Sequence, residues 1–262
     1  MKTQFPPYEV FLEFAEKLAD VSGEMLLAAA NKVPEIDVKS DASFVTQTDK
    51  AVEKTMREMI AQAYPDHGIL GEEFENINLD AEYVWVLDPI DGTAPFIAGI
   101  PVYGTLIGLA WKGKPFVGVI NHPATSDRWV GVSGLFANRN GQPANVKACA
   151  ELSKAFVTCS SPDFMSEDEL ARLTKLRKIV PYVQYGGSCF VYGTLASGRT
   201  DLAVDSGLDP YDVYASAAVI QGAGGFMTDW DGNEITLDWS GKVIAAGDRD
   251  CLEAAIEILK AD

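Results

Sequence analysis

The segment at residues 85–93, WVLDPIDGT, constrains the fold of this chain more than any other. An apolar strand ends here in a glycine turn, and Asp88 and Asp91 stand three residues apart on either side of Pro89. A strand end of this kind directs two carboxylates at one place, where they repel each other unless a cation lies between them. Asp, Pro and Gly are also ordinary turn residues, so a plain strand-to-turn junction is the alternative. Two acids, a glycine and the Thr93 hydroxyl together favour a divalent-cation site.

The composition excludes several classes of protein. The chain is 47% hydrophobic over 262 residues, enough for one large domain or two lobes around a buried core. Its 38 acidic residues against 21 basic ones give a net charge of −17, which disfavours nucleic acid and anionic membranes as partners. Residues 1–30 carry Glu and Lys throughout, and no later apolar run could cross a bilayer, so we expect a cytoplasmic protein. The four cysteines lack the paired spacing of a zinc site or a disulfide framework.

The first half of the sequence predicts helices followed by antiparallel strands. Apolar residues at helical spacing indicate the helices, and short apolar runs between turn residues indicate the strands. The expected elements are a helix from Val10 to about Ala30, an extended segment at 44–48, a helix from about Asp49, a strand at 83–87, a hairpin of strands at 102–111 and 116–120, and a strand at 128–133. We therefore expect an N-terminal α+β lobe, residues 1–150, with an antiparallel sheet and most of the metal ligands.

After residue 150 the pattern changes to an alternation of strands and helices. The expected elements are a strand at 156–159, a helix opened by the capping box of Ser166 and Glu169, a strand at 179–184 followed by a helix, a strand at 201–204, a helix at 211–221, a hairpin at 226–236 and a final helix at 248–260. Alternation of this kind is typical of an α/β lobe. We therefore expect a C-terminal lobe, residues 151–262, that packs tightly on the first and supplies Asp212.

Acidic residues stand near the ends of several expected elements: Asp49, Glu72, Glu73, Asp88, Asp91 and Asp212. Oxygen ligands at separated positions are what Mg²⁺ prefers, with water and substrate phosphate completing its coordination. A short helix expected to begin at residues 91–93 offers backbone N–H groups to a phosphate oxygen, and Gly92 permits its close approach. Metal ions opposite such a helix indicate hydrolysis of a phosphate ester by direct attack of water.

Other chemistries fit the sequence less well. An aspartyl-phosphate phosphatase would need a DxDGT motif, but two residues rather than one separate Asp88 from Asp91. A Ser-His triad would have only His67 and His122 to use, without a GxSxG turn, so both are interpreted as loop or structural residues. A calcium loop beginning at Asp229 lacks the glycine required at its sixth position, and a hairpin turn explains the segment better.

Four longer motifs occur in order along the chain: VTQTD at 45–49, GEE at 71–73, WVLDPIDGT at 85–93 and LDPYDVYASAAVIQGAGG at 208–225. With these motifs over nearly its whole length, the chain resembles the inositol monophosphatase superfamily of magnesium-dependent, lithium-sensitive phosphatases. The resemblance implies an α/β (α+β) fold, a layered αβαβα sandwich of the inositol monophosphatase and fructose-1,6-bisphosphatase type. It also implies a metal site between two lobes and, usually, a homodimer.

By motif position, the resemblance implies a role for individual residues. The Mg²⁺ ligands would be Glu72, Asp88, Asp91, Asp212 and the backbone carbonyl of Ile90. Asp49 and Thr93 would orient and activate the attacking water, with Glu72 counted beside them as catalytic. The substrate contacts would be Asp91, Gly92, Thr93, Ser188, Asp205 and Asp212, with the phosphate on the N–H groups of Gly92 and Thr93. Glu73 is interpreted as a solvated neighbour, and Lys39 as either a residue on the substrate side or a surface lysine.

Within the superfamily, the chain is most similar to the histidinol-phosphatase branch. The segment YGTLIGLAWKGKPFVGVINHP with its RWVG continuation supports this, as does SGLDPYD, where inositol phosphatases usually carry WD. The branch commonly has Lys and Ser at the positions of Ala94 and Pro95, Asp at Ser188 and Glu at Asp205. These departures bear on the substrate, because a cationic amine or imidazole would favour acidic partners.

Three hypotheses are compatible with these residues. The first is a Mg²⁺-dependent phosphomonoesterase that hydrolyses a small phosphorylated metabolite, histidinol phosphate. The second is an inositol-1-monophosphatase or a broader sugar-phosphate phosphatase, to which Ser188, Ala94 and Pro95 point. The third is a catalytically silent metal-binding scaffold, although every inferred ligand is retained.

Overall fold

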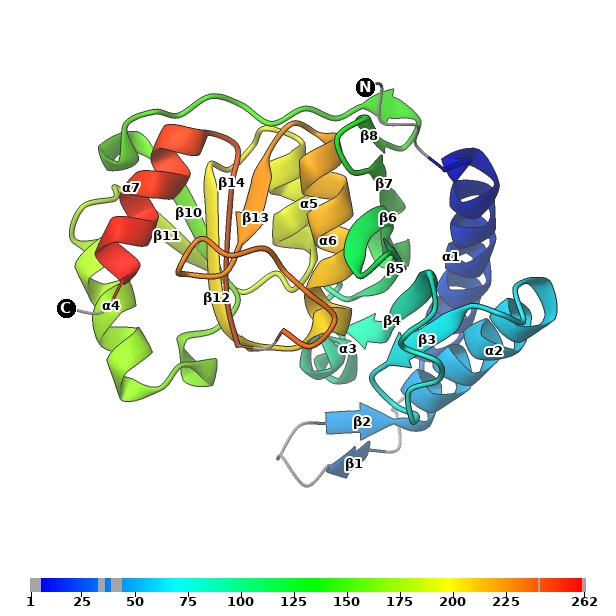
Figure 1. The fold of residues 1–262 in the computed structure, drawn as a ribbon. Helices are drawn as coiled ribbons and strands as arrows, with labels where there is room; N and C mark the ends of the chain where they lie inside the picture. The colour runs from blue at the N-terminus through cyan, green and yellow to red at the C-terminus, as the bar shows by residue number, and fades with distance from the viewer. Residues whose placement is uncertain (1–5, 33–35, 39–43, 240, 261–262) are drawn as a thin grey trace.

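Helices and two large β-sheets form the part of the chain that the computed structural model describes, residues 6–32, 36–38, 44–239 and 241–260 (Figure 1). Lys39 lies outside the described residues. The α-helices are α1 (Tyr8–Ala30), α2 (Gln47–Ala63), α3 (Thr93–Ala98), α4 (Glu167–Arg177), α5 (Phe190–Ala196), α6 (Pro210–Gly222) and α7 (Arg249–Leu259). Single 3-10 turns are η1 (Pro123–Thr125), η2 (Leu152–Lys154) and η3 (Pro162–Phe164).

The strands build one small and two large sheets. A hairpin consists of β1 (Ile36–Val38) and β2 (Phe44–Thr46). The seven-stranded sheet contains, in spatial order, β3 (Gly68–Gly71), β4 (Tyr83–Asp91), β5 (Gly104–Trp111), β6 (Lys114–His122), β7 (Asp127–Val132), β8 (Phe136–Arg139) and β9 (Gln142–Pro143). The five-stranded sheet contains β11 (Tyr182–Tyr185), β10 (Phe156–Cys159), β12 (Leu202–Leu208), β14 (Gly241–Ala246) and β13 (Phe226–Thr228).

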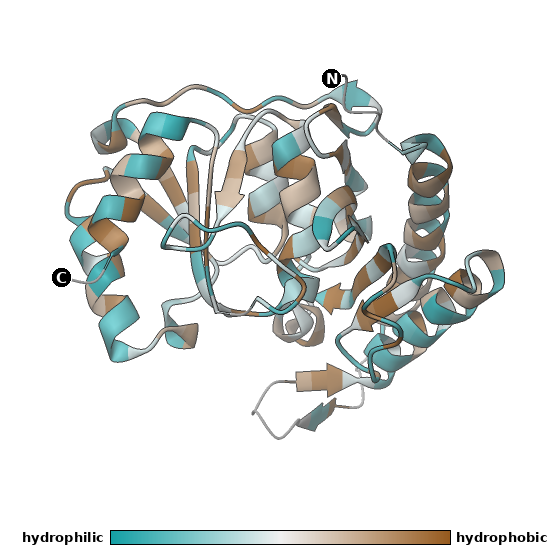
Figure 2. Ribbon diagram, viewed as in Figure 1, coloured by the Kyte–Doolittle hydropathy of each residue, from teal (hydrophilic) through white to brown (hydrophobic). Residues whose placement is uncertain are grey.

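The helices and sheets stack in five layers. Helices α1 and α2 cover one face of the seven-stranded sheet, α5 and α6 lie between the two sheets, and α4 and α7 cover the outer face of the five-stranded sheet (Figure 1). Each interface is a cluster of buried apolar side chains. Figure 2 shows hydrophobic residues along β10 and hydrophilic residues on the outer helices α4 and α7. The layered αβαβα fold implied by the resemblance is therefore confirmed.

Strong local signals predicted most elements well. The first helix ends at Ala30 as expected. The Ser166 hydroxyl accepts a hydrogen bond from the Glu169 backbone N–H, and the Glu169 carboxylate accepts one from the Ser166 N–H, so the predicted capping box opens α4. The expected hairpin forms from β5 and β6, which pair antiparallel around Lys112.

Two boundaries near the acidic residues differ from the expectation. Helix α2 begins at Gln47 rather than Asp49, because the Thr46 side chain caps its first turn and the Asp49 carboxylate returns to Thr46. Strand β4 continues past Leu87 to Asp91, because Ile90 is buried with its apolar residues and Asp91 still pairs with Gly104. Both differences place an acidic side chain inside a regular element.

The expected hairpin at 226–236 is wrong. Strand β13 pairs with β14, with Phe226 opposite Ala246, and not with the residues that follow it directly. The chain does turn after β13, because the Asp229 carboxylate accepts hydrogen bonds from the backbone N–H groups of Asp231 and Asn233. This local turn was visible in the sequence, whereas the partner strand lies further along the chain.

Helix α6 joins the two halves of the molecule. It follows β12 in the five-stranded sheet, yet it packs directly on β5, β6 and β7 of the seven-stranded sheet. The division into lobes at residue 150 stays a prediction.

A row of glycines lets α6 approach this sheet closely. Gly108, Gly118 and Gly131 stand opposite one another on the neighbouring strands β5, β6 and β7. A Cβ atom at Gly118 would lie 2.2 Å from the carbonyl oxygen of Ala215, and one at Gly131 would lie 2.6 Å from the Cα of Val219. The glycine row therefore sets the distance between helix and sheet.

We expect Gly118→Ala to lower the free energy of unfolding by about 1–3 kcal/mol, because the added methyl group forces α6 away from the sheet. Urea unfolding measured by circular dichroism would show the change. Lys114→Ala, at the exposed start of the same strand, is the control and should change stability by less than about 0.5 kcal/mol. An unchanged Gly118→Ala midpoint would mean that α6 does not rest on this row.

Candidate metal and phosphate site

Three carboxylates converge where β4 ends and α6 begins. Asp88 and Asp91 come from β4 and Asp212 from the first turn of α6, and one oxygen of each lies within 4.8 Å of the others. Asp209 caps α6, and the Asp212 carboxylate accepts a hydrogen bond from the Asp209 N–H at 2.7 Å. The cap therefore fixes the third acid in its place beside the strand end.

An irregularity in β4 lets its two acids act together. Residues three apart on a regular strand point to opposite faces of a sheet. Between Asp88 and Asp91 the pairing with β5 shifts register, since Asp88 stands opposite Leu106 and Asp91 opposite Gly104. The Thr105 hydroxyl donates a hydrogen bond to the Pro89 carbonyl at 3.0 Å across this bulge. A bulge redirects side chains in this way, so both carboxylates reach one site.

Glu72 reaches the same region from the neighbouring strand. No sequence signal had predicted β3, which runs parallel to β4 with Gly71 opposite Leu87. Because parallel strands end at the same edge of a sheet, Glu72 leaves β3 beside Asp88. The negative charge of Glu72 helps to raise the pKa of both Asp88 and Asp212.

The electrostatics of Asp88 are those of a carboxylate suited to hold a cation. Burial raises its pKa well above the ordinary value, and the charges of Glu72, Asp91, Asp212 and Asp49 raise it further. Its side chain is buried, and Oδ1 has no hydrogen-bond partner among the described residues. Several carboxylates gathered at one place, together with an Asp88 oxygen that lacks a partner among the described residues, fit a hard divalent cation that takes oxygen ligands.

Asp49 and Thr93 lie together as the resemblance implied. The Thr93 hydroxyl is 3.3 Å from Asp49 Oδ1 and 3.0 Å from the Ile90 carbonyl oxygen, and its single proton can serve only one of them at a time. Asp49 Oδ2 accepts hydrogen bonds from the N–H and the hydroxyl of Thr46. Burial raises the pKa of Asp49 in spite of these bonds. The Thr46 contribution was missed, although the Thr-x-x-Asp spacing of a capping box was present in the sequence.

The glycine turn meets a loop from the other half of the chain. Gly92 has φ +83°, and a Cβ atom there would lie 2.5 Å from Ser188 Oγ. Ser188 itself has φ +47°, and the next residue, Cys189, donates its backbone N–H to Asp91 Oδ2. The structure therefore brings Ser188 beside Gly92, and Cys189, which no sequence pattern singled out, holds Asp91.

Asp205 uses both of its carboxylate oxygens in hydrogen bonds to protein groups. It is buried in β12, and its two carboxylate oxygens accept hydrogen bonds from the Ser160 backbone N–H and the Tyr192 hydroxyl. Burial raises the pKa of Asp205. A carboxylate held by two protein donors is better placed to support the loop around it than to meet a substrate directly.

Both histidines have structural partners, in agreement with the sequence interpretation. The Trp85 indole N–H donates to His67 Nδ1 at 3.2 Å. His122 is buried at the end of β6 with Nε2 3.1 Å from Cys189 Sγ, and burial lowers its pKa to about 4. His122 is therefore neutral at physiological pH and supports the residue that holds Asp91.

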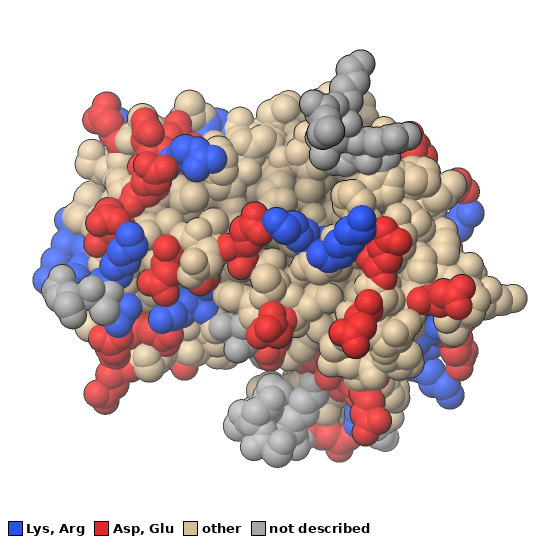
Figure 3. Space-filling model, viewed as in Figure 1, with Lys and Arg blue, Asp and Glu red and all other residues tan. Residues whose placement is uncertain are grey.

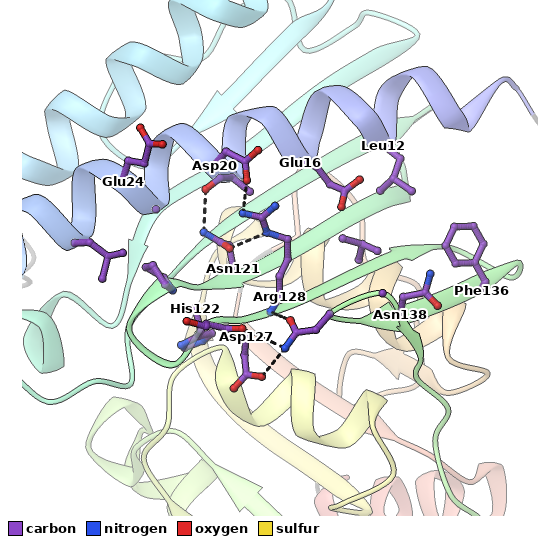
Figure 4. A pocket seen from close by; sticks show the side chains of 18 residues that line it. Leu12, Glu16, Asp20, Glu24, Asn121, His122, Asp127, Arg128, Phe136 and Asn138 are labelled. Atoms are coloured by element: carbon purple, nitrogen blue, oxygen red, sulfur yellow. Dashed lines mark hydrogen bonds and ion pairs between the residues drawn. The ribbon is translucent and has the colours of Figure 1, made fainter.

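A groove on the described surface lies elsewhere. Its volume is about 720 Å³, and it runs between α1 and the strands β6 to β8, lined by Glu16, Asp20 and Asn138 among others (Figure 4). Arg128 crosses it, paired with Asp20 at 2.8 Å and donating to Asn121 at 2.9 Å. Asp88, Asp91 and Asp212 do not line this groove.

Known proteins share this architecture. The model of the inositol monophosphatase family matches residues 8–261. The bifunctional phosphatase IMPL2 of Arabidopsis thaliana, named as chloroplastic, is 41% identical over 95% of this chain and 75% of its own length. A histidinol-phosphatase of Chlorobaculum parvum is 33% identical over 89% of this chain and 91% of its own. A solved structure of an inositol monophosphatase from Zymomonas mobilis has a TM-score of 0.89 at 37% identity, covering 98% of this chain and 100% of that chain.

The layered fold and the converging carboxylates define a metal-dependent phosphomonoesterase. Since the family match and these relatives cover nearly all of the sequence, the chain belongs to the inositol monophosphatase family.

We expect Asp88→Asn to stabilise the protein in chelator by about 1–2 kcal/mol, because one buried like charge is removed. The folded-state pKa of Asp88 is raised, so folding binds a proton at pH values between the unfolded and folded pKa. The stability of the wild type therefore falls as pH rises through this window, and the variant should lack the Asp88 share of that fall. Urea unfolding in chelator at about pH 5 and about pH 8 measures both effects.

In Mg²⁺ the wild type should become more stable than the Asp88→Asn variant. The cation should stabilise the wild type by binding the folded state, and stabilise the Asp88→Asn variant much less. Asp80→Asn makes the same change of charge at an exposed position and serves as the control. If Asp88→Asn destabilised the protein in chelator, the carboxylate repulsion inferred here would be wrong.

Proposed function

We propose that the chain is a Mg²⁺-dependent phosphatase that hydrolyses histidinol phosphate. The dependence on a metal is supported by the convergence of Asp88, Asp91 and Asp212. Among the described residues, Asp88 Oδ1 has no hydrogen-bond partner. Support for the substrate comes from relatives named histidinol-phosphatase at 33% and 36% identity. Both candidate esters carry an anionic phosphate, and a chain of net charge −17 attracts the cationic amine of histidinol phosphate more than the uncharged ring of inositol 1-phosphate.

The proposed ligands supply only oxygen atoms. The carboxylates of Glu72, Asp88, Asp91 and Asp212 and the Ile90 carbonyl would hold the cation, and their hard donors fit Mg²⁺. When bound, Mg²⁺ supplies Lewis-acid chemistry: it lowers the pKa of water and neutralises phosphate charge. Glu72 stays a proposal in both its ligand and catalytic roles.

The chain itself would handle the proton and the phosphate. Asp49 Oδ1 lies 3.3 Å from the Thr93 hydroxyl, so the two can share one water molecule and orient it by hydrogen bonds. A raised pKa makes the Asp49 carboxylate a better proton acceptor than an exposed aspartate. Phosphate oxygens would accept hydrogen bonds from the N–H groups of Gly92 and Thr93, where the absent side chain of Gly92 leaves room.

The leaving group would lie towards the Ser188 loop. Ser188 stands next to Gly92, so its hydroxyl can meet the alcohol part of the substrate. Asp205 would act on the substrate through Tyr192 and the loop, since its own oxygens are engaged. Asp91 and Asp212 would then be the carboxylates nearest to a cationic amine.

The decisive measurement is kcat/KM for histidinol phosphate and for inositol 1-phosphate, with Mg²⁺ and in chelator. We expect a preference for histidinol phosphate of at least about tenfold, which corresponds to about 1.4 kcal/mol in the transition state. Chelator should abolish both activities.

Asp91→Asn should lose phosphate release by at least about 100-fold while its circular dichroism stays unchanged, because it removes a proposed ligand.

A preference for the inositol ester would favour the second hypothesis instead. The specific observations behind it are Ser188, Ala94 and Pro95 and the likeness to the Zymomonas mobilis inositol monophosphatase. A wild-type protein that binds Mg²⁺ but hydrolyses neither ester, nor any of a panel of sugar phosphates, would favour the silent scaffold.

The remaining expectations concern partners and location. On the face shown in Figure 3, Lys and Arg side chains lie among Asp and Glu side chains rather than in one stripe. None of the described helices has the length and apolar character needed to cross a bilayer. The homodimer and the cytoplasmic location stay predictions, as does the absence of nucleic-acid and membrane partners.

A further inference from the structure

Helix α2 carries a polar stripe that faces the candidate site. Asp49, Glu53 and Arg57 follow one another at four-residue spacing, which puts them on one face of the helix. Another face carries Val52, Met56 and Ile60, all fully buried against α1 and the seven-stranded sheet. Asp49 at the start of the stripe contacts Thr93, so the same helix supplies one of the two residues proposed to orient water.

Glu53 is a buried carboxylate with a hydrogen-bond donor on each of its two oxygens. Its side chain is 0% exposed; Oε1 accepts from Arg57 Nε at 2.7 Å and Oε2 accepts from the Glu73 backbone N–H at 2.8 Å. A carboxylate that far from water must be paired and hydrogen-bonded to remain charged. Glu53 thus ties the backbone next to Glu72 to α2.

Arg57 completes the connection with the other end of its planar side chain. Nη1 donates to the Glu75 carbonyl at 3.0 Å and Nη2 donates to the Phe74 carbonyl at 3.1 Å. The guanidinium carbon also lies 5.8 Å from the centre of the Phe74 ring. A guanidinium holds its donors in a rigid fork, which lysine cannot reproduce. The loop at 71–76 is therefore fastened to α2 through three consecutive backbone positions.

On the other side of Glu72, the backbone of Gly71 also lies close to the Glu53 side chain. A Cβ atom at Gly71 would lie 2.2 Å from Glu53 Oε1, so only glycine fits between β3 and the buried pair. The residues before and after Glu72 thus both contact Glu53. The backbone of Glu72 has little freedom to move relative to α2.

We propose that Glu53 and Arg57 are positioning residues that set Glu72 against Asp88 and Asp212, and so set the affinity of the site for its divalent cation. The inference rests on the proposed role of Glu72 as a ligand. One rigid helix would then place both the water-orienting pair and a ligand from a separate loop. Neither Glu53 nor Arg57 touches the substrate in this account.

Binding of Mn²⁺ alone, followed by electron paramagnetic resonance, tests the proposal without any substrate. Arg57→Met should weaken Mn²⁺ binding about tenfold, the lower end of what the loss of a residue supporting metal ligands costs. In parallel, the Mg²⁺ concentration for half-maximal phosphate release should rise by a similar factor, while kcat at saturating Mg²⁺ should stay within about threefold of the wild type. Arg57→Lys, which keeps the charge beside Glu53 but loses the fork, should give an intermediate affinity and provides a second variant if Arg57→Met folds poorly.

The matched control lies on the exposed face of the same helix. Lys54 and Glu58 form an ion pair with the same spacing at 4.0 Å, with the Lys54 side chain 70% exposed, so Lys54→Met should leave Mn²⁺ binding unchanged. Unchanged Mn²⁺ affinity in folded Arg57→Met and Arg57→Lys, with only a lower melting temperature, would overturn the inference. Failure of the wild type to bind Mn²⁺ would instead overturn the proposed metal site itself.

Discussion

Repulsion among the carboxylates of Glu72, Asp88, Asp91 and Asp212 is the constraint around which this molecule is arranged. Burial raises the pKa of Asp88, Asp91 and Asp212, and the charge of Glu72 raises the pKa of Asp88 and of Asp212 further. Stability alone would favour a fold in which these carboxylates lie apart or are neutralised. The three apolar clusters that fill the interfaces between the layers stabilise the chain enough to hold the acids together.

Local backbone features hold Asp88, Asp91 and Asp212 in place. A bulge between Asp88 and Asp91 turns two side chains of one strand towards the same place, and the Thr105 hydroxyl bonds across it. The capping box with Asp209 holds Asp212, and the glycine row lets α6 lie close enough to the sheet for Asp212 to reach β4. Preorganisation of this kind means that binding a cation need not rearrange the protein, which favours tight and specific binding.

The proposed substrate side is built differently from the proposed metal side. Ser188, Cys189 and Asp205 belong to the second half of the chain; Asp205 accepts hydrogen bonds from Ser160 and Tyr192, and Cys189 contacts His122. Under the proposed function, a substitution at Ser188 would change the fit of the leaving group, whereas Cys189 also holds Asp91 at the end of β4. This arrangement is consistent with one family containing both a histidinol-phosphatase and an inositol monophosphatase among the relatives of this chain.

The local elements and the kind of chemistry follow from the amino-acid sequence. Apolar residues at helical spacing predicted α1, and a capping box predicted the start of α4. Carboxylates beside a glycine turn indicated a site for a divalent cation. Tertiary structure alone decided which acids meet, because convergence depends on strand pairing and helix packing between residues far apart in the chain. The parallel pairing of β3, the partner of β13, the bulge in β4, and the contacts of Cys189 and of the Glu53–Arg57 pair are all of this kind. Such contacts leave no periodic signal in one sequence, since each depends on what the rest of the chain places opposite.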